Sequence, residues 1–154
     1  MRREIAWLDG RIVPRAELAL PVGDAGFVLG ATVTEQLRTF GGRLFLPAEH
    51  AHRLAESLAA IGLEPPVPVA DIIQAAADVA AHNHAQGESG SDLGVVAFVT
   101  PGDLPAQHAG RGGAARAVVH SFPLAFPLWA RGYDEGLALR SVSVRQVPEA
   151  CWPI

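Results

Sequence analysis

The sequence DAGFVLGATVTEQLRTFGGRLFLPAEHAHRL, residues 24–54, holds a glycine-punctuated turn, a predicted strand pair and the beginning of a predicted helix. Gly26 and Gly30 flank the apolar tripeptide FVL, and glycine permits the tight turn or close backbone approach expected there. Residues 32–40 are rich in β-branched and aromatic side chains, which favour a strand. A Gly-Gly pair then predicts a hairpin turn into a second strand at 43–46.

The predicted strand at 32–40 has no purely apolar face. Successive side chains of a strand point to opposite faces of the sheet. One face would carry Thr34, Gln36, Arg38 and Phe40, and the other Val33, Glu35, Leu37 and Thr39. This pattern favours a strand with one solvated or ligand-facing side over a strand buried on both faces.

Two helices are predicted after this strand pair. Pro47 suits the first turn of a helix, where its missing N–H costs nothing. Apolar and small residues then recur at intervals of three and four until Gly62, the expected end of the helix. A second helix is predicted over residues 69–85 by the same periodicity.

The remaining segments predict an antiparallel sheet around these helices. Residues 4–14 read as a hairpin about Asp9-Gly10, a typical two-residue turn. Residues 93–100 form a nearly continuous apolar strand suited to a sheet interior, and 114–121 predict another strand. The loop between them, 101–113, is long enough to suggest a functional role.

A domain boundary is expected near the end of the chain. The segment FPLAFPLWA, residues 122–130, contains two prolines among bulky apolar residues and is interpreted as a linker. Residues 137–144 then predict a strand of a new domain. We therefore expect an N-terminal domain over 1–121 and the beginning of a second domain over 131–154.

Composition excludes several classes of protein. The chain has 154 residues, 49% hydrophobic and 18% charged, with a net charge of -4 and no basic run, which argues against a nucleic-acid-binding surface. No window reaches the ~20 apolar residues of a membrane span. The single cysteine, Cys151, cannot form an internal disulfide, which suits a reducing cytoplasm. We expect a cytoplasmic protein.

Seven short motifs occur in order along the chain. They are W-L-D-G (7–10), D-x-G-F-x-x-G (24–30), R-L-F (43–45), H-x-x-R-L (50–54), V-T-P-G (99–102), Y-D-E-G (133–136) and V-R (144–145). In this order and spacing they resemble the N-terminal half of the fold-type IV pyridoxal-phosphate enzymes, or class IV aminotransferases. That family includes branched-chain and D-amino-acid aminotransferases and aminodeoxychorismate lyases.

The resemblance implies an α/β (α+β) fold. An antiparallel sheet with helices on one side would be followed by the start of a second, barrel-like domain. It also implies a homodimer and pyridoxal 5'-phosphate as the cofactor. In H-x-x-R-L the arginine binds the cofactor phosphate, and this residue is Arg53 here; its planar guanidinium suits phosphate oxygens. His50 would orient the helix, and Glu35 would pair or cap across the hairpin.

The chain contains no lysine, since all 12 residues of the Lys+Arg count are arginines. The family attaches its cofactor to a lysine, which also serves as the general base. We therefore expect no catalytic residue within these residues, and the 154-residue chain alone should be inactive. In the family this lysine follows the segment that residues 144–154 resemble, so we expect it directly after Ile154.

The resemblance is less complete at the positions that match the family's substrate-binding residues. The family lines its pocket with aromatic side chains, and here the matching positions are Leu29 and Thr34, which implies a wider or more polar pocket. Arg38 shares the strand face of Thr34 and could reach a substrate carboxylate. The R-x-H carboxylate motif of the D-amino-acid branch is Ala106-Gln107-His108 here, so His108 remains without its arginine. No metal site is expected, because His82 and His84 form too weak a pattern.

Three functions stay open from the sequence. The first is an aminotransferase that moves an amino group between an amino acid and a 2-oxo acid. The second is an aminodeoxychorismate lyase of the same family, distinguished by release of pyruvate from aminodeoxychorismate. The third is a non-catalytic binding or assembly module, which the missing lysine would suit.

Overall fold

A computed structural model describes residues 3–87 and 91–143 of the chain. Its strands are β1 (Ile5–Leu8), β2 (Arg11–Pro14), β3 (Val33–Phe40), β4 (Arg43–Leu44), β5 (Leu93–Thr100) and β6 (Arg116–Pro123). Its helices are α1 (Ala25–Val28), α2 (Pro47–Ala60), α3 (Val69–Gln86) and α4 (Phe126–Glu135), with 3-10 turns at Arg15–Glu17 and Pro105–Gln107.

Tight turns with positive φ angles join β1 to β2 and β3 to β4. Asp9 and Gly10 have φ angles of 48° and 88°, and Gly41 and Gly42 have φ angles of 57° and 78°. Positive φ at both central residues characterises the two-residue turn whose twist matches that of its flanking strands. Both predicted hairpins are therefore confirmed.

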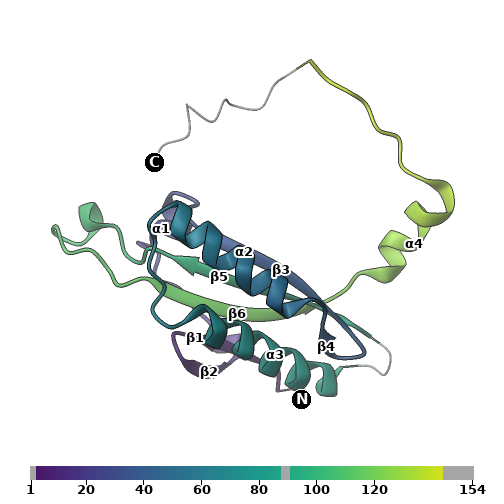
Figure 1. Cartoon of the computed structure of the whole chain (residues 1–154), viewed down its shortest axis with the longest axis horizontal. Coiled ribbons are helices and arrows are strands. Elements are labelled where there is room, and N and C mark those ends of the chain that lie inside the picture. Colours follow the sequence, from purple (N-terminus) through teal and green to yellow (C-terminus); the bar gives the residue numbers. More distant parts are fainter. Residues whose placement is uncertain (1–2, 88–90, 144–154) are drawn as a thin grey trace. The chain divides into compact units, whose positions relative to one another are not determined.

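Within the described residues, six strands form one antiparallel sheet in the order β2-β1-β6-β5-β3-β4 (Figure 1). Strand β5 lies between β6 and β3 and pairs with β6 from Leu93↔Pro123 to Thr100↔Arg116. Most of its side chains are buried, as its apolar sequence predicts for a sheet interior. The predicted α+β class with an antiparallel sheet is confirmed.

Helices α2 and α3 cover one face of this sheet (Figure 1). Leu54 and Leu58 of α2 are almost fully buried, and α3 buries its apolar stripe in the same core. The sheet contributes every second residue of its central strands to this core. The sheet members are Trp7, Val33, Leu37, Val95, Ala97, Val99, Ala117 and Val119.

Strand β3 divides into the two faces that its alternation predicts. Thr34 and Gln36 are exposed, so the predicted solvated side exists. The opposite face is buried beneath the helices even where it is polar, with Glu35 4% exposed and Thr39 fully buried. A carboxylate therefore lies between the sheet and α2.

Asn83 joins α3 to the sheet because its side-chain amide pairs with both the N–H and the carbonyl of one residue of β1. Its side chain is 3% exposed; Oδ1 accepts from the Ile5 N–H at 2.8 Å and Nδ2 donates to the Ile5 carbonyl at 2.8 Å. Nδ2 also donates to Ser121 Oγ at 2.9 Å. The amide thus connects β1, β6 and the helix at one point.

The chain divides into two compact units after Leu124. Strand β6 extends through Pro123, and α4 begins at Phe126, so most of the predicted linker 122–130 has regular structure. The strand predicted over 137–144 is wrong for 137–143, which carry no strand. A strand needs a partner for its backbone groups, and the described part of the second unit contains none. The segment 144–154 lies outside the described residues.

None of the helices in the described part of the chain combines the length and apolarity needed to cross a bilayer.

Candidate functional site

Glu35, His50 and Arg53 form a compact cluster between β3 and α2, called the Glu35 cluster below. Arg53 Nε donates to Glu35 Oε1 at 2.8 Å, and Arg53 Nη2 donates to Oε2 at 2.5 Å. His50 Nδ1 lies 2.7 Å from Oε2. His50 and Arg53 are one helical turn apart, so both face the same carboxylate. The expected pairing of Glu35 across its hairpin is wrong, because its partners lie on the helix.

The electrostatics of the Glu35 cluster favour an ionised carboxylate. The hydrogen bond from Arg53 lowers the pKa of Glu35, and His50 lowers this pKa further. Burial acts in the opposite direction without cancelling these effects. The same contact raises the pKa of Arg53. A charge-assisted, two-point pair of this kind orients the guanidinium plane as well as stabilising both charges.

The orientation of Arg53 leaves one edge of its guanidinium toward solvent. Its side chain is 62% exposed, and Nη1 has no hydrogen-bond partner within the described residues. The remaining N–H groups can donate to a phosphate oxygen while Glu35 holds the other edge. The residues present therefore fit one contact to the phosphate of pyridoxal phosphate. The described residues contain no lysine to hold its ring.

Replacing Glu35 by glutamine is expected to change how the free energy of unfolding depends on pH. The folded-state pKa of Glu35 is below its ordinary 4.5, so its ionised form contributes stability that is complete above pH 4.5. That contribution is lost as the pH falls through the lowered pKa. The difference in unfolding free energy between wild type and Glu35→Gln should be largest near neutral pH and should shrink below pH 4.5.

Urea unfolding at a series of pH values measures this difference. Glu64→Gln, at an exposed position outside the cluster, serves as the control, and its difference from wild type should stay small throughout. A Glu35→Gln difference that does not vary with pH would contradict the assigned ion pair.

Thr34 and Arg38 lie on the exposed side of β3, as predicted. Arg38 is already engaged by its neighbours: Nη2 lies 4.0 Å from Asp92 Oδ2, and its guanidinium lies 3.9 Å from the ring centroid of Phe40. These contacts hold the side chain between Phe40 of its own strand and Asp92, the residue before β5. A substrate role for Arg38 stays a prediction.

Leu29 and His108 lie on two neighbouring segments. Leu29 follows α1 directly, within the α1 turn defined here as residues 23–30, and is 67% exposed. His108 lies on the long loop, residues 101–113, and its side chain is 44% exposed. A Cβ built on Gly23 would lie 2.8 Å from His108 Cε1, so only glycine permits the ring to approach this closely.

Backbone contacts bind the α1 turn to the long loop. The Ala25 N–H donates to the Gly102 carbonyl at 2.8 Å, and the Leu104 N–H donates to the Gly23 carbonyl at 3.0 Å. Asp24 and Asp103 form an isolated antiparallel bridge between the same segments. The structure thus places two predicted substrate residues, Leu29 and His108, on segments that are hydrogen-bonded to each other.

Sequence reasoning missed the polar residues beneath these segments. Asp24 is fully buried; Oδ1 accepts from the Gly26 N–H at 2.7 Å, and Oδ2 accepts from Thr100 Oγ1 at 2.9 Å. Arg116, the first residue of β6, lies 3.3 Å from Asp24 Oδ2. The signal available was the aspartate that opens D-x-G-F-x-x-G, a motif residue to which no role was assigned.

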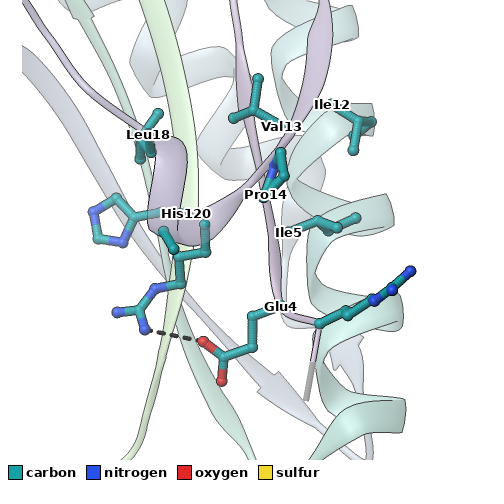
Figure 2. Close-up of a pocket in the computed structure, with 10 residues that line it drawn as sticks. Glu4, Ile5, Ile12, Val13, Pro14, Leu18 and His120 are labelled. Atoms are coloured by element: carbon teal, nitrogen blue, oxygen red, sulfur yellow. Dashed lines mark hydrogen bonds and ion pairs between the residues drawn. The ribbon is translucent and has the colours of Figure 1, made fainter. Parts of the chain in front are cut away.

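A groove of about 960 Å³ lies elsewhere, against the edge of the sheet formed by β1 and β2 (Figure 2). Its apolar lining includes Ile5, Ile12, Val13 and Leu18, and its ionisable lining residues are Arg3, Glu4, Arg15 and His120. Burial lowers the pKa of His120, and the nearby positive charge of Arg15 adds to this effect. None of the residues predicted to bind cofactor or substrate lines this groove.

A smaller cavity of about 590 Å³ lies within the long loop. His108 lines it together with Asp103, Gln107 and Arg111. Across residues 3–87 and 91–143, no three His, Cys, Asp or Glu side chains converge as metal ligands would.

Comparison with known proteins gives the following similarities. A D-alanine aminotransferase from Bacillus licheniformis is 30% identical over 120 residues, which cover 77% of this chain and 41% of that protein. A branched-chain aminotransferase from Thermoproteus uzoniensis, solved with norvaline, matches with a TM-score of 0.65 and 23% identity, covering 79% of this chain and 41% of the other.

A hypothetical aminotransferase from Mycobacterium tuberculosis, solved in its PLP-bound form, matches with a TM-score of 0.65 and 22% identity, covering 84% of this chain and 43% of the other. No family model matches the chain. The chain spans less than half the length of the curated relatives it matches.

Proposed function

The chain is homologous to the N-terminal part of D-alanine and branched-chain aminotransferases, and from this premise we propose that it forms one wall of a pyridoxal-phosphate site. The proposed activity of the whole protein is transfer of an amino group between an amino acid and a 2-oxo acid. Pyridoxal phosphate would supply the electron sink for this reaction. The observation that carries the proposal is the exposed edge of Arg53, held in place by a buried carboxylate.

Each member of the Glu35 cluster has a separate part in this proposal. Arg53 donates to the phosphate and contributes charge. Glu35 fixes the guanidinium plane through two hydrogen bonds and stays ionised because Arg53 lowers its pKa. His50 donates to Glu35 in the tautomer that carries its proton on Nδ1, which adds a third hydrogen bond to the two from Arg53.

The lysine of the proposed enzyme must come from outside these 154 residues, because they contain none. We propose that it directly follows Ile154. Reading the gene beyond the codon for Ile154, with the intact mass of the cellular protein, tests this placement. The full-length protein assayed with 2-oxoglutarate and a panel of amino acids then tests the activity.

The remaining residues complete the proposal. Leu29, Thr34, Arg38 and His108 are proposed to face the amino-acid substrate. Thr34 is supported by its exposed position on β3, and Leu29 and His108 are supported by the contacts between their segments. A homodimer in the cytoplasm is proposed for the whole protein from the family resemblance.

Replacing Arg53 by glutamine is expected to weaken binding of pyridoxamine 5'-phosphate to the 154-residue chain by about tenfold, because a charged hydrogen-bond donor to the phosphate is lost. Pyridoxamine 5'-phosphate is chosen since it has no aldehyde to react with the N-terminal amine. Titration followed by NMR measures the dissociation constant and identifies the amides that respond.

Two controls make the result specific. Arg43→Gln removes an exposed arginine from β4 and should leave binding unchanged. Pyridoxamine without its phosphate should bind wild type and Arg53→Gln equally weakly. Equal affinity of wild type and Arg53→Gln for the phosphorylated ligand would overturn the phosphate assignment.

A further inference from the structure

Arg116 lies among three carboxylates that come from three separate segments. Nη1 is 4.0 Å from Asp9 Oδ2 in the β1–β2 turn, Nε is 3.3 Å from Asp24 Oδ2 in the α1 turn, and Nη2 is 3.2 Å from Asp103 Oδ2 in the long loop. The arginine side chain is 25% exposed. These four residues are called the Arg116 cluster below.

The three carboxylates differ in the hydrogen bonds that they accept from groups other than Arg116. Asp9 Oδ1 accepts from the Ala117 N–H at 2.7 Å, and Asp24 accepts from a backbone N–H and a threonine hydroxyl. Asp103 has less support: its Oδ1 is buried without a hydrogen-bond partner within the described residues. The directional hydrogen bond from Arg116 goes to this residue, from Nη2 to Oδ2.

The balance of charges in the Arg116 cluster explains how Arg116 stabilises the packing of these segments. One guanidinium faces three carboxylates, so without it three negative charges would remain close together with one of them fully buried. A buried charge that loses its partner is strongly destabilising. The backbone hydrogen bonds of the sheet hold β1 and β6 in place. Movement of the long loop away from the α1 turn would therefore relieve the repulsion between the carboxylates.

We propose that Arg116 is a positioning residue that holds the long loop against the α1 turn and so sets the position of His108 relative to Leu29. Only the description of these two residues as substrate-facing rests on the proposed function. The contact itself concerns the loop and the turn, whatever ligand they serve.

Hydrogen exchange followed by NMR tests the proposal on the 154-residue chain. In Arg116→Met, the Ala25, Leu104 and Gly113 amides should exchange at least about tenfold faster, because each donates across or within these segments. Amides of β3 and α3 should keep their wild-type rates. Arg15→Met, which removes the 2.9 Å pair with Glu4 at the open end of the β1–β2 hairpin, is the matched control and should leave the three amides unchanged.

A double variant separates a charge effect from loss of side-chain volume. Asn at position 9 keeps an oxygen for the Ala117 N–H while removing one carboxylate charge, so Asp9→Asn combined with Arg116→Met should recover part of the lost protection. No recovery would overturn the proposal, as would unchanged exchange in Arg116→Met or an equal acceleration in every element.

A milder substitution covers the case in which Arg116→Met does not fold. Asp103→Asn leaves the pair of Arg116 with Asp24 in place and removes the charge of the loop carboxylate, which lies 3.2 Å from Arg116 Nη2 and 4.0 Å from His108 Nε2. Leu104 and Gly113 should then exchange faster, and unchanged rates would overturn the proposal. None of these readouts involves the cofactor, so this inference and the Arg53 assignment can fail independently.

Discussion

Replacing Gly102 by alanine is expected to lower the free energy of unfolding by about 2–5 kcal/mol, the sum of a left-handed backbone and a steric collision. Gly102 has a φ angle of +83°, which alanine adopts at a cost. A Cβ at this position would also lie 2.0 Å from the Ala114 carbonyl oxygen. The backbone of Ala114, which directly follows the long loop, cannot rotate away as a side chain can.

Gly110 provides the control for this substitution within the same loop. Its φ angle is +81°, but a Cβ there would meet no atom within 4 Å. Gly110→Ala should therefore cost only the conformational part, about 1–2 kcal/mol. Urea unfolding of both variants measures the two costs. Equal losses would contradict a close approach of the loop arms at Gly102.

Replacing Asn83 by alanine is expected to lower the free energy of unfolding by about 2–4 kcal/mol, because buried polar groups lose their partners. The Ile5 N–H and carbonyl and the Ser121 hydroxyl would each lose a hydrogen bond to the amide. Strand β1 should also exchange its amide hydrogens faster, since the contact holds it to α3.

Gln74→Ala is the matched control for Asn83→Ala. It removes an amide side chain from the same helix, where Gln74 is exposed and donates to Asp78 at 3.0 Å on the helix surface. Its loss should be no more than about 0.5 kcal/mol. A similar loss at both positions would show that the contacts of Asn83 with β1 contribute little.

Local signals in the sequence were sufficient for much of the fold. The turns at Asp9-Gly10 and Gly41-Gly42 require positive φ, and these residue pairs tolerate it. Strand β5 occupies the sheet interior that its apolar run predicts, and α2 begins at Pro47 as expected. Each of these features depends on residues close together in the chain.

Features that depend on distant partners could not be predicted in the same way. A strand over 137–143 needs another strand for its hydrogen bonds, and its own composition does not reveal that none is present in the described part of its unit. Helix α4 was missed because prolines at 123 and 127 suggested a linker, although Pro127 lies where the first turn of a helix tolerates it.

The candidate site also combines residues that the sequence identifies with contacts that depend on distant parts of the chain. Arg53 and Glu35 were both identified by resemblance, but their two-point pairing joins residues 18 positions apart and depends on how α2 lies over β3. The Arg116 cluster joins residues from four parts of the chain. Nothing in the local sequence around Arg116 distinguishes it from an ordinary arginine at the start of a strand.

The close approach of the two arms of the long loop has a consequence for evolution and engineering. The Gly113 N–H donates to the Asp103 carbonyl at 3.0 Å, so the arms are joined before the loop widens into residues 105–112. Insertions beyond this junction leave the sheet untouched, and doubling the length of a flexible loop costs only about 0.6 kcal/mol. The length and sequence of residues 105–112 can therefore vary while the scaffold that supports them stays constant.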